Sequence, residues 1–192
     1  MEEGKLQVKL EDIKKVTLSD GVERVYIDSY DKLYLIVNER FKKQKKETPD
    51  TEPIIDLSRL KIKIGNPHNV NEICPLDIKD LYGKIEGIIK LKDEHDTNDD
   101  GMLIPPNEDD ILYVVKYKIS FEESILYSMQ FKKIKYLKFV NFKYSCFFDY
   151  TNVTNSIFLD DVDLSYIDLN RQIKDGDKLL SDRSICFTNL IF

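Results

Sequence analysis

Apolar and polar residues alternate over several short segments of this chain, and a period of two is typical of β-strands with one buried face. Strands of this kind are expected at residues 6–10, 22–27, 60–64 and 184–192. The second of them follows directly after the turn Ser19-Asp20-Gly21. The apolar end of the last segment predicts that it docks against the rest of the protein.

A helical spacing of apolar residues follows the second of these strands. Leu33, Val37 and Phe41 fall on one face of a helix. The alternation of Leu33, Leu35 and Val37 would also suit a strand, and we favour the helix. A second, shorter helix is expected after Pro75, because the negative charge of Asp77 favours the N-terminus of a helix.

The segment 111–142 predicts a strand, a helix and another strand. Ile111 to Ile119 alternate as one long, largely buried strand. Ser120-Phe121-Glu122-Glu123 matches a capping box, in which the serine accepts from the third helical N–H and the glutamate reaches back to the serine amide. Strand-like β-branched and aromatic residues return from Ile134 to Phe142.

Together these elements predict an α+β protein: a β-rich single globular unit with a few short helices. Residues 1–47 are expected to supply N-terminal strands and a helix, with a small lobe as one arrangement. Residues 48–58 are expected to be a loop or linker, because their prolines break regular structure. Residues 59–192 would form the main α+β domain, which carries an acidic loop at 93–110.

A five-residue spacing of apolar positions runs from Val140 to Leu169, with an interruption at Asn152. Over about thirty residues this spacing resembles a pentapeptide-repeat β-helix. That family has a small residue two positions before each central apolar residue, and this chain departs from the pattern at Tyr150, Asn155 and Asp160. Ordinary strands and turns are the simpler interpretation. The spaced apolar residues are Phe142, Phe147, Ile157, Val162 and Ile167.

The composition is that of an ordinary globular protein, with 42% hydrophobic residues in 192. The net charge of -6 and the isoelectric point near 5.1 do not support a chain-wide preference for nucleic acid or anionic membranes. The net charge of the whole chain does not exclude local basic patches on its surface.

Several sequence features indicate a soluble, cytoplasmic protein. The segment Met1–Lys5 has no apolar stretch of a secretory signal, and no run reaches the length of a membrane span. The 3 cysteines have no C-x-x-C spacing, which favours reduced thiols in an intracellular setting. The absence of alanine and tryptophan and the excess of lysine over arginine indicate an AT-rich genome, such as that of a large DNA virus, a mobile element or a low-GC microbe.

The acidic loop contains half of a calcium-binding motif. Asp96, Asn98 and Asp100 stand at the first, third and fifth positions of an EF-hand loop and are followed by a glycine. The twelfth position is Asn107 in place of the closing glutamate, and the two prolines before it exclude an exiting helix. A weak Ca²⁺ site is the only cofactor hypothesis, and a solvated turn is the alternative reading of the same residues.

A second cluster has the composition of a platform for single-stranded nucleic acid. Lys132, Lys133, Lys135 and Lys138 alternate with aromatic residues, as in proteins that bind such strands. Lysines also protect the edges of hydrophobic strands from aggregation. Because the whole chain is acidic, we favour that second interpretation.

No catalytic motif stands out, so the sequence favours a protein that is not an enzyme. His68 and His95 are the only histidines, and neither lies in a local signature with a cysteine. Glycine-rich phosphate-binding loops and a G-x-S-x-G motif are also missing.

The leading functional hypothesis is an intracellular protein-binding factor: an accessory, inhibitor, immunity or assembly protein. The acidic charge suits a basic partner, and abundant Tyr and Phe can anchor an interface. Met102, Leu103 and Ile104, at the end of the acidic loop, are the candidate contact residues. A nucleic-acid-binding or metal-dependent nucleic-acid-processing protein is the first alternative, and a viral structural protein is the second.

Overall fold

The computed structural model describes residues 8–66, 69–93, 108–148, 150–167, 174–175, 178–179 and 184–192. Strands dominate and helices are few, so the predicted class, a β-rich α+β unit, is confirmed. The helices are η1 (Leu10–Asp12), α1 (Tyr30–Glu47), α2 (Ile78–Leu81) and η3 (Glu108–Asp110). The strands are β1 (Lys15–Thr17), β2 (Glu23–Ile27), β3 (Ile54–Asp56), β4 (Leu60–Ile62), β5 (Ile64–Asn66), β6 (Asn69–Cys74), β7 (Leu76–Asp77), β8 (Ile88–Lys90), β9 (Tyr113–Val115), β10 (Lys118–Ser120), β11 (Ile125–Leu126), β12 (Met129–Lys132), β13 (Ile134–Tyr136), β14 (Val140–Asn141), β15 (Cys146–Phe147), β16 (Tyr150–Phe158), β17 (Val162–Asp163), β18 (Lys174–Asp175), β19 (Lys178–Leu179) and β20 (Ser184–Ile191).

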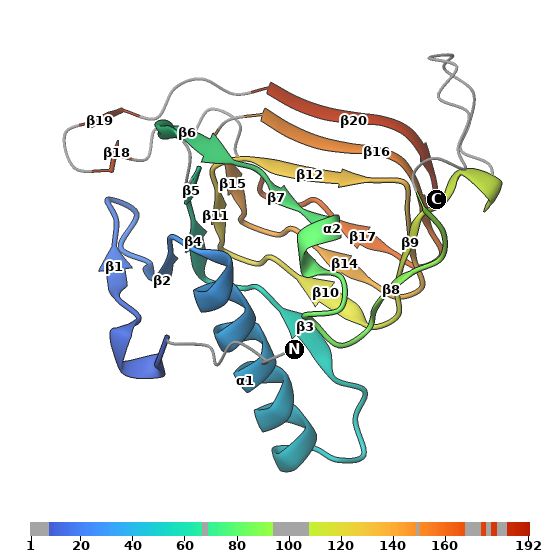
Figure 1. Ribbon diagram of the computed structural model, residues 1–192, viewed down its shortest axis with the longest axis horizontal. Coiled ribbons are helices and arrows are strands. Elements are labelled where there is room, and N and C mark those ends of the chain that lie inside the picture. The colour runs from blue at the N-terminus through green and yellow to red at the C-terminus, as the bar shows by residue number, and fades with distance from the viewer. Residues whose placement is uncertain are drawn as a thin grey trace.

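Most of these strands stack in parallel as successive coils of one winding chain (Figure 1). On one face the order is β17-β14-β10-β3, and every pairing in it is parallel. Its register aligns Ile55, Ile119, Val140 and Val162, one residue from each coil. Parallel pairing of this kind requires the chain to return to the same face, one strand further along the stack, after each turn.

The other faces repeat the same stacking. β4, β11 and β15 pair in parallel on the second face. β7, β12, β16 and β20 do so on the third. β13 pairs in parallel with β9 and with the end of β16, which bends around a corner of the coil. The structure is therefore a parallel β-solenoid. The described part of the segment that we interpreted as ordinary strands and turns, residues 140–148 and 150–167, forms one coil and the start of the next.

Equivalent side chains stack on one another inside the solenoid. The rings of Phe121 and Phe142 lie 4.9 Å apart and are nearly parallel, and those of Tyr136 and Phe158 lie 4.6 Å apart. These spacings match the separation of hydrogen-bonded strands, about 4.8 Å. Each aromatic ring therefore contacts the equivalent ring of the next coil, and the core is continuous along the solenoid axis.

Buried serines link neighbouring coils at one inner corner. Ser124 Oγ donates to the Leu57 carbonyl at 2.5 Å and accepts from the Leu60 N–H at 3.1 Å. One coil further on, Ser145 Oγ donates to the Phe121 carbonyl at 2.6 Å. Both serines are fully buried, so these hydroxyls satisfy backbone groups that water cannot reach.

The corners of the coils use a left-handed backbone conformation at residues other than glycine. Arg59, Glu123, Tyr144 and Tyr166 occupy equivalent corners and have φ between 52° and 58°. This conformation costs a non-glycine residue roughly 1 kcal/mol, so the stacked hydrogen bonds on either side must hold each corner in place.

Helix α1 covers the first coil. Its buried residues Leu33, Val37 and Phe41 confirm the predicted helical face. Gln44 accepts from the Ile54 N–H at 2.7 Å and donates to the Ile54 carbonyl at 3.2 Å. Arg40 Nη1 donates to the carbonyls of Asp56 and Ser58 at 3.1 and 2.8 Å. Side chains of α1 therefore occupy the hydrogen-bonding groups at the outer edge of β3.

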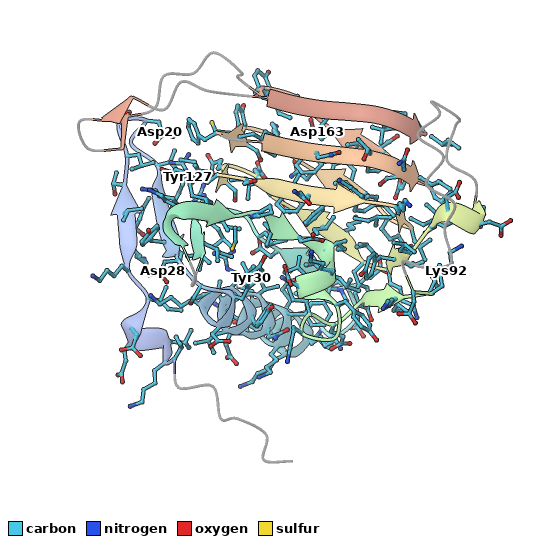
Figure 2. All side chains as sticks on the ribbon, turned by 45° about the horizontal axis from the view of Figure 1, so that its top comes forward. Asp20, Asp28, Tyr30, Lys92, Tyr127 and Asp163 are labelled. Carbon is cyan, nitrogen blue, oxygen red and sulfur yellow. The ribbon has the colours of Figure 1, made fainter. Side chains whose placement is uncertain are left out.

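Strands that run outside the coils cover two other edges of the first coil. β2 pairs in parallel with β4, and β1 pairs with β2 in the antiparallel direction. β8 pairs antiparallel with β9. Tyr30, labelled in Figure 2, connects the start of α1 to α2, since its hydroxyl donates to Asp80 Oδ2 at 2.8 Å.

The prediction of a helix after the capping box is wrong. Residues 121–124 form a turn, and Glu123 stands at a left-handed corner with φ of 58°. The N–H groups that would begin a helix donate instead to the next coil, from Phe121 to Asn141 and from Glu123 to Lys143. Hydrogen bonds between coils therefore override the local capping signal.

Further predictions about strands need correction. The long strand from Ile111 to Ile119 is broken at Lys116-Tyr117, where the chain turns from β9 into β10. Residues 134–142 are likewise divided between β13 and β14. Leu10 begins a 3₁₀ helix in place of a strand, and residues 1–7 lie outside the described part of the chain. The strands expected at 22–27 and 184–192 and the short helix after Pro75 are confirmed, whereas the strand expected at 60–64 is divided at Lys63 between β4 and β5.

Replacing Gly87 by alanine should destabilise the fold strongly. Gly87 has φ of 92°, and a Cβ there would lie 2.3 Å from the ring of Tyr117. Left-handed strain and overpacking together predict a loss of about 3 kcal/mol in the free energy of unfolding, measured by urea denaturation. Gly83→Ala is the control, because Gly83 has φ of 70° and open space around it. It should lose about 1 kcal/mol, and equal losses in the two variants would contradict the argument.

Ser124→Ala tests the serine link between coils. The substitution leaves the Leu57 carbonyl and the Leu60 N–H without their buried partner and should cost about 2 kcal/mol of unfolding free energy. Ser165→Ala, at an exposed position of the last coil, should stay within about 0.5 kcal/mol of the wild type. A neutral Ser124→Ala variant would show that the link is dispensable.

Candidate functional site

Two predicted sites lie outside the described residues. The calcium hypothesis rests on Asp96, Asn98 and Asp100, and the contact hypothesis rests on the segment Met102–Ile104. Both fall within residues 94–107, so both stay predictions. Within the described ranges, no group of three or more His, Cys, Asp or Glu side chains is placed to hold a metal ion.

The predicted lysines divide into two groups in the structure. Lys132 and Lys133 line one polar pocket of about 240 Å³ together with Lys79. Lys135 forms an ion pair with Glu108 at 2.5 Å, and Lys138 lies 3.7 Å from Glu52. The structure therefore brings together the first two lysines and pairs the other two with carboxylates elsewhere.

This lysine pocket also contains a carboxylate. Asp77 caps the N-terminus of α2 by accepting from the Lys79 N–H at 3.0 Å, and it forms an ion pair with the Lys79 ammonium at 3.2 Å. Burial raises the pKa of Asp77 above its ordinary value. Thr154 and Asn155 complete the lining from the neighbouring strand. The pocket thus combines both charges with neutral hydrogen-bonding groups.

A larger exposed apolar area lies on the last coil. Phe192 is 75% exposed and Leu159 is 58% exposed, and both line a depression of about 620 Å³. Leu164 and Ile191 line the same depression and are also exposed. We call Leu159, Leu164, Ile191 and Phe192 the terminal-coil surface. An exposed apolar patch of this kind is typical of an interaction site.

Carboxylates surround the terminal-coil surface. Asp160 and Asp161 line the same depression, and Asp163 lies on the adjacent strand β17. Hydrogen bonds from Ser165 lower the pKa of Asp163, so that carboxylate keeps its charge in mildly acidic solution. The surface is therefore apolar at its centre and negatively charged at its rim.

The strands beside this surface have open edges in the described part of the chain. β17 pairs with β14 alone, and β20 pairs with β16 alone. β20 lies at the opposite end of the stack from α1 (Figure 1). Backbone groups on such an edge can pair with a strand from another chain.

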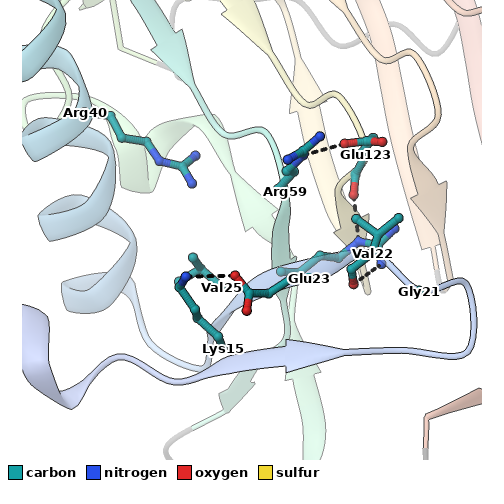
Figure 3. Close-up of a pocket in the computed structure, with 9 residues that line it drawn as sticks. Lys15, Gly21, Val22, Glu23, Val25, Arg40, Arg59 and Glu123 are labelled. Carbon is teal, nitrogen blue, oxygen red and sulfur yellow. Dashed lines mark hydrogen bonds and ion pairs between the residues drawn. The ribbon is translucent and has the colours of Figure 1, made fainter.

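A separate pocket of about 470 Å³, which we call the arginine pocket, lies where β1 and β2 meet the corners at Arg59 and Glu123 (Figure 3). Its positive groups are Lys15, Arg24, Arg40 and Arg59. Its negative groups are Glu23 and Glu123. Sequence reasoning missed this pocket, because its arginines come from β2, α1 and the turn before β4.

Neither described thiol indicates catalysis. Cys74 is partly buried and Cys146 is buried. His68 and His95 lie outside the described residues, so no imidazole can be placed near either thiol.

Comparisons with known proteins give no relative for this chain. No family model, curated protein or solved structure matches it. Among the described residues, no helix has the length and apolar character needed to cross a membrane.

Proposed function

We propose that this protein is a protein-binding factor that contacts its partner through the terminal-coil surface. The observation that carries the proposal is the exposure of Leu159 and Phe192 beside β17 and β20, each of which has one edge that pairs with no described strand. A few buried side chains near the centre of an interface supply most of the binding energy, and aromatic residues such as Phe192 are enriched at interfaces.

The acidic rim favours a partner of opposite charge. Asp160, Asp161 and Asp163 would repel an acidic protein and attract a basic one over about 8 Å at physiological salt. The open edge of β20 can in addition accept a backbone strand. The chemistry that fits is an extended or amphipathic segment with apolar side chains at its centre and lysine or arginine at its sides.

Leu159→Lys tests this proposal. The variant places a positive charge at the centre of the surface, where a basic partner would meet like charge and lose an apolar contact. We expect the partner recovered with the wild-type protein by affinity purification from its native host to bind at least tenfold more weakly, about 1.4 kcal/mol or more. Binding of the purified pair is measured by calorimetry at two salt concentrations.

Leu10→Lys is the matched control, because Leu10 is 52% exposed but lies in η1, away from the last coil. It should bind the partner as the wild type does. A partner that Leu159→Lys retains at full affinity, or one whose affinity is independent of salt, would contradict the proposed surface.

Nucleic-acid binding is the second candidate, and the shared pocket of Lys79, Lys132 and Lys133 favours it. Lysines gathered on one surface can neutralise several phosphates of one strand. The ion pairs of Lys135 and Lys138 with carboxylates reduce the net charge of the rest of the predicted cluster.

Fluorescence anisotropy with a labelled single-stranded oligonucleotide tests this candidate. If it is correct, affinity should fall steeply with salt, and replacing both Lys132 and Lys133 by glutamine should lower the salt slope by roughly 1.4, since each phosphate contact on a single strand contributes about 0.7. A replacement of Lys118, which is exposed on β10, serves as the control. No change in anisotropy at low salt would exclude the candidate.

A further inference from the structure

We propose that the arginine pocket binds a phosphate group, with Arg40 and Arg59 as its ligands. The pocket is built by four separate parts of the chain: the β1–β2 hairpin, helix α1, the corner at residue 59 and the corner at residue 123. Its volume of about 470 Å³ lies within the range of roughly 300–1,000 Å³ that is typical of small-molecule sites.

Some N–H groups of the Arg40 guanidinium have no acceptor among the described residues. Its Nη1 donates to the carbonyls of Asp56 and Ser58, and the same atom lies 3.5 Å from Asp56 Oδ2. Its Nε and Nη2 donate to no described residue. The side chain is 26% exposed and extends from α1 toward the turn that carries Arg59 (Figure 3). A half-buried guanidinium with unoccupied donors is suited to an oxyanion.

Arg59 faces the same pocket with one donor in use. Its Nε donates to Glu123 Oε2 at 2.5 Å, and its terminal nitrogens donate to no described residue. Arg59 is 66% exposed, so an incoming ligand can reach it without rearrangement of the fold. Together the two guanidinium groups can offer the paired N–H geometry that phosphate oxygens accept.

The remaining charges in the pocket are already matched by neighbours. Arg24 is buried and forms a two-point ion pair with Asp20, at 2.9 and 2.7 Å. Lys15 pairs with Glu23 at 2.8 Å. The donors open to a ligand are therefore the unoccupied N–H groups of Arg40 and Arg59. The carboxylates that compete with the ligand are Asp56 beside Arg40 and Glu123 beside Arg59.

Because Glu123 competes with the ligand, substitutions at Arg59 and at Glu123 should change the phosphate affinity in opposite directions. Arg59→Gln removes a ligand donor and should weaken binding at least tenfold. Glu123→Gln removes the competing carboxylate and should strengthen binding several-fold, while its backbone carbonyl can still accept from Arg24 Nε. Lys42→Gln is the control for loss of a positive charge, because Lys42 lies on the same helix as Arg40 but is exposed and paired with Glu39.

The probes are inorganic phosphate and phenyl phosphate, titrated by calorimetry into the wild-type protein and the three variants at low salt. Binding should weaken as the pH falls through about 6, where a phosphate monoester loses its second charge while guanidinium keeps its own. Tighter binding of phenyl phosphate would identify an organic phosphate as the ligand class, and equal binding would identify free phosphate.

Any one of three results would contradict the proposal. They are the absence of saturable binding of both probes at millimolar concentration, an Arg59→Gln variant that binds as the wild type does, or a Glu123→Gln variant that binds more weakly. Arg40→Gln is not used alone, because Arg40 also holds the edge of β3. Circular dichroism of each variant establishes that it is folded before its binding is measured.

Discussion

Backbone hydrogen bonding between stacked coils is the constraint on which the rest of this structure depends. A stack of parallel strands satisfies the N–H and C=O groups of every inner coil, but it leaves a row of unpaired groups at each end. At the first coil, Gln44 and Arg40 satisfy β3, while β2 and β8 pair with β4 and β9. The N-terminal helix and hairpin are therefore best understood as a cap for the solenoid.

The same constraint explains why the interior repeats so strictly. When each coil lies about 4.8 Å above the previous one, a side chain at one level must fit the equivalent side chain at the next. The stacked pairs Phe121–Phe142 and Tyr136–Phe158 meet this condition, and so do the buried serines 124 and 145. The left-handed corners stack in the same way, because a turn of the same shape is needed at every level.

Local patterns in the sequence were enough to predict the elements whose shape depends on their own residues. Helix α1 follows from the spacing of Leu33, Val37 and Phe41, and its N-cap Ser29 accepts from the Lys32 N–H. Strand β2 follows from its alternation and from the turn before it.

Elements that depend on a neighbouring coil could not be predicted in this way. Ser120 to Glu123 has the signature of a helix start, but its N–H groups donate to residues of the next coil. The five-residue spacing from Phe142 onward carried information about the coils, but the bulky residues beside it obscured that signal. The arginine pocket joins residues 24, 40 and 59, and only the fold brings those positions together.

The position of Arg40 ties the cap to the arginine pocket. Its Nη1 donates to the carbonyls of Asp56 and Ser58 at the end of β3, and the same side chain lines the pocket. An anion bound there would fix the guanidinium in the orientation that caps the strand. Because a ligand that binds only the folded state stabilises it in proportion to its occupancy, phosphate would raise the stability of the first coil in particular. The terminal-coil surface lies at the other end of the stack, so a protein partner and an anion could bind the same molecule without competing for residues.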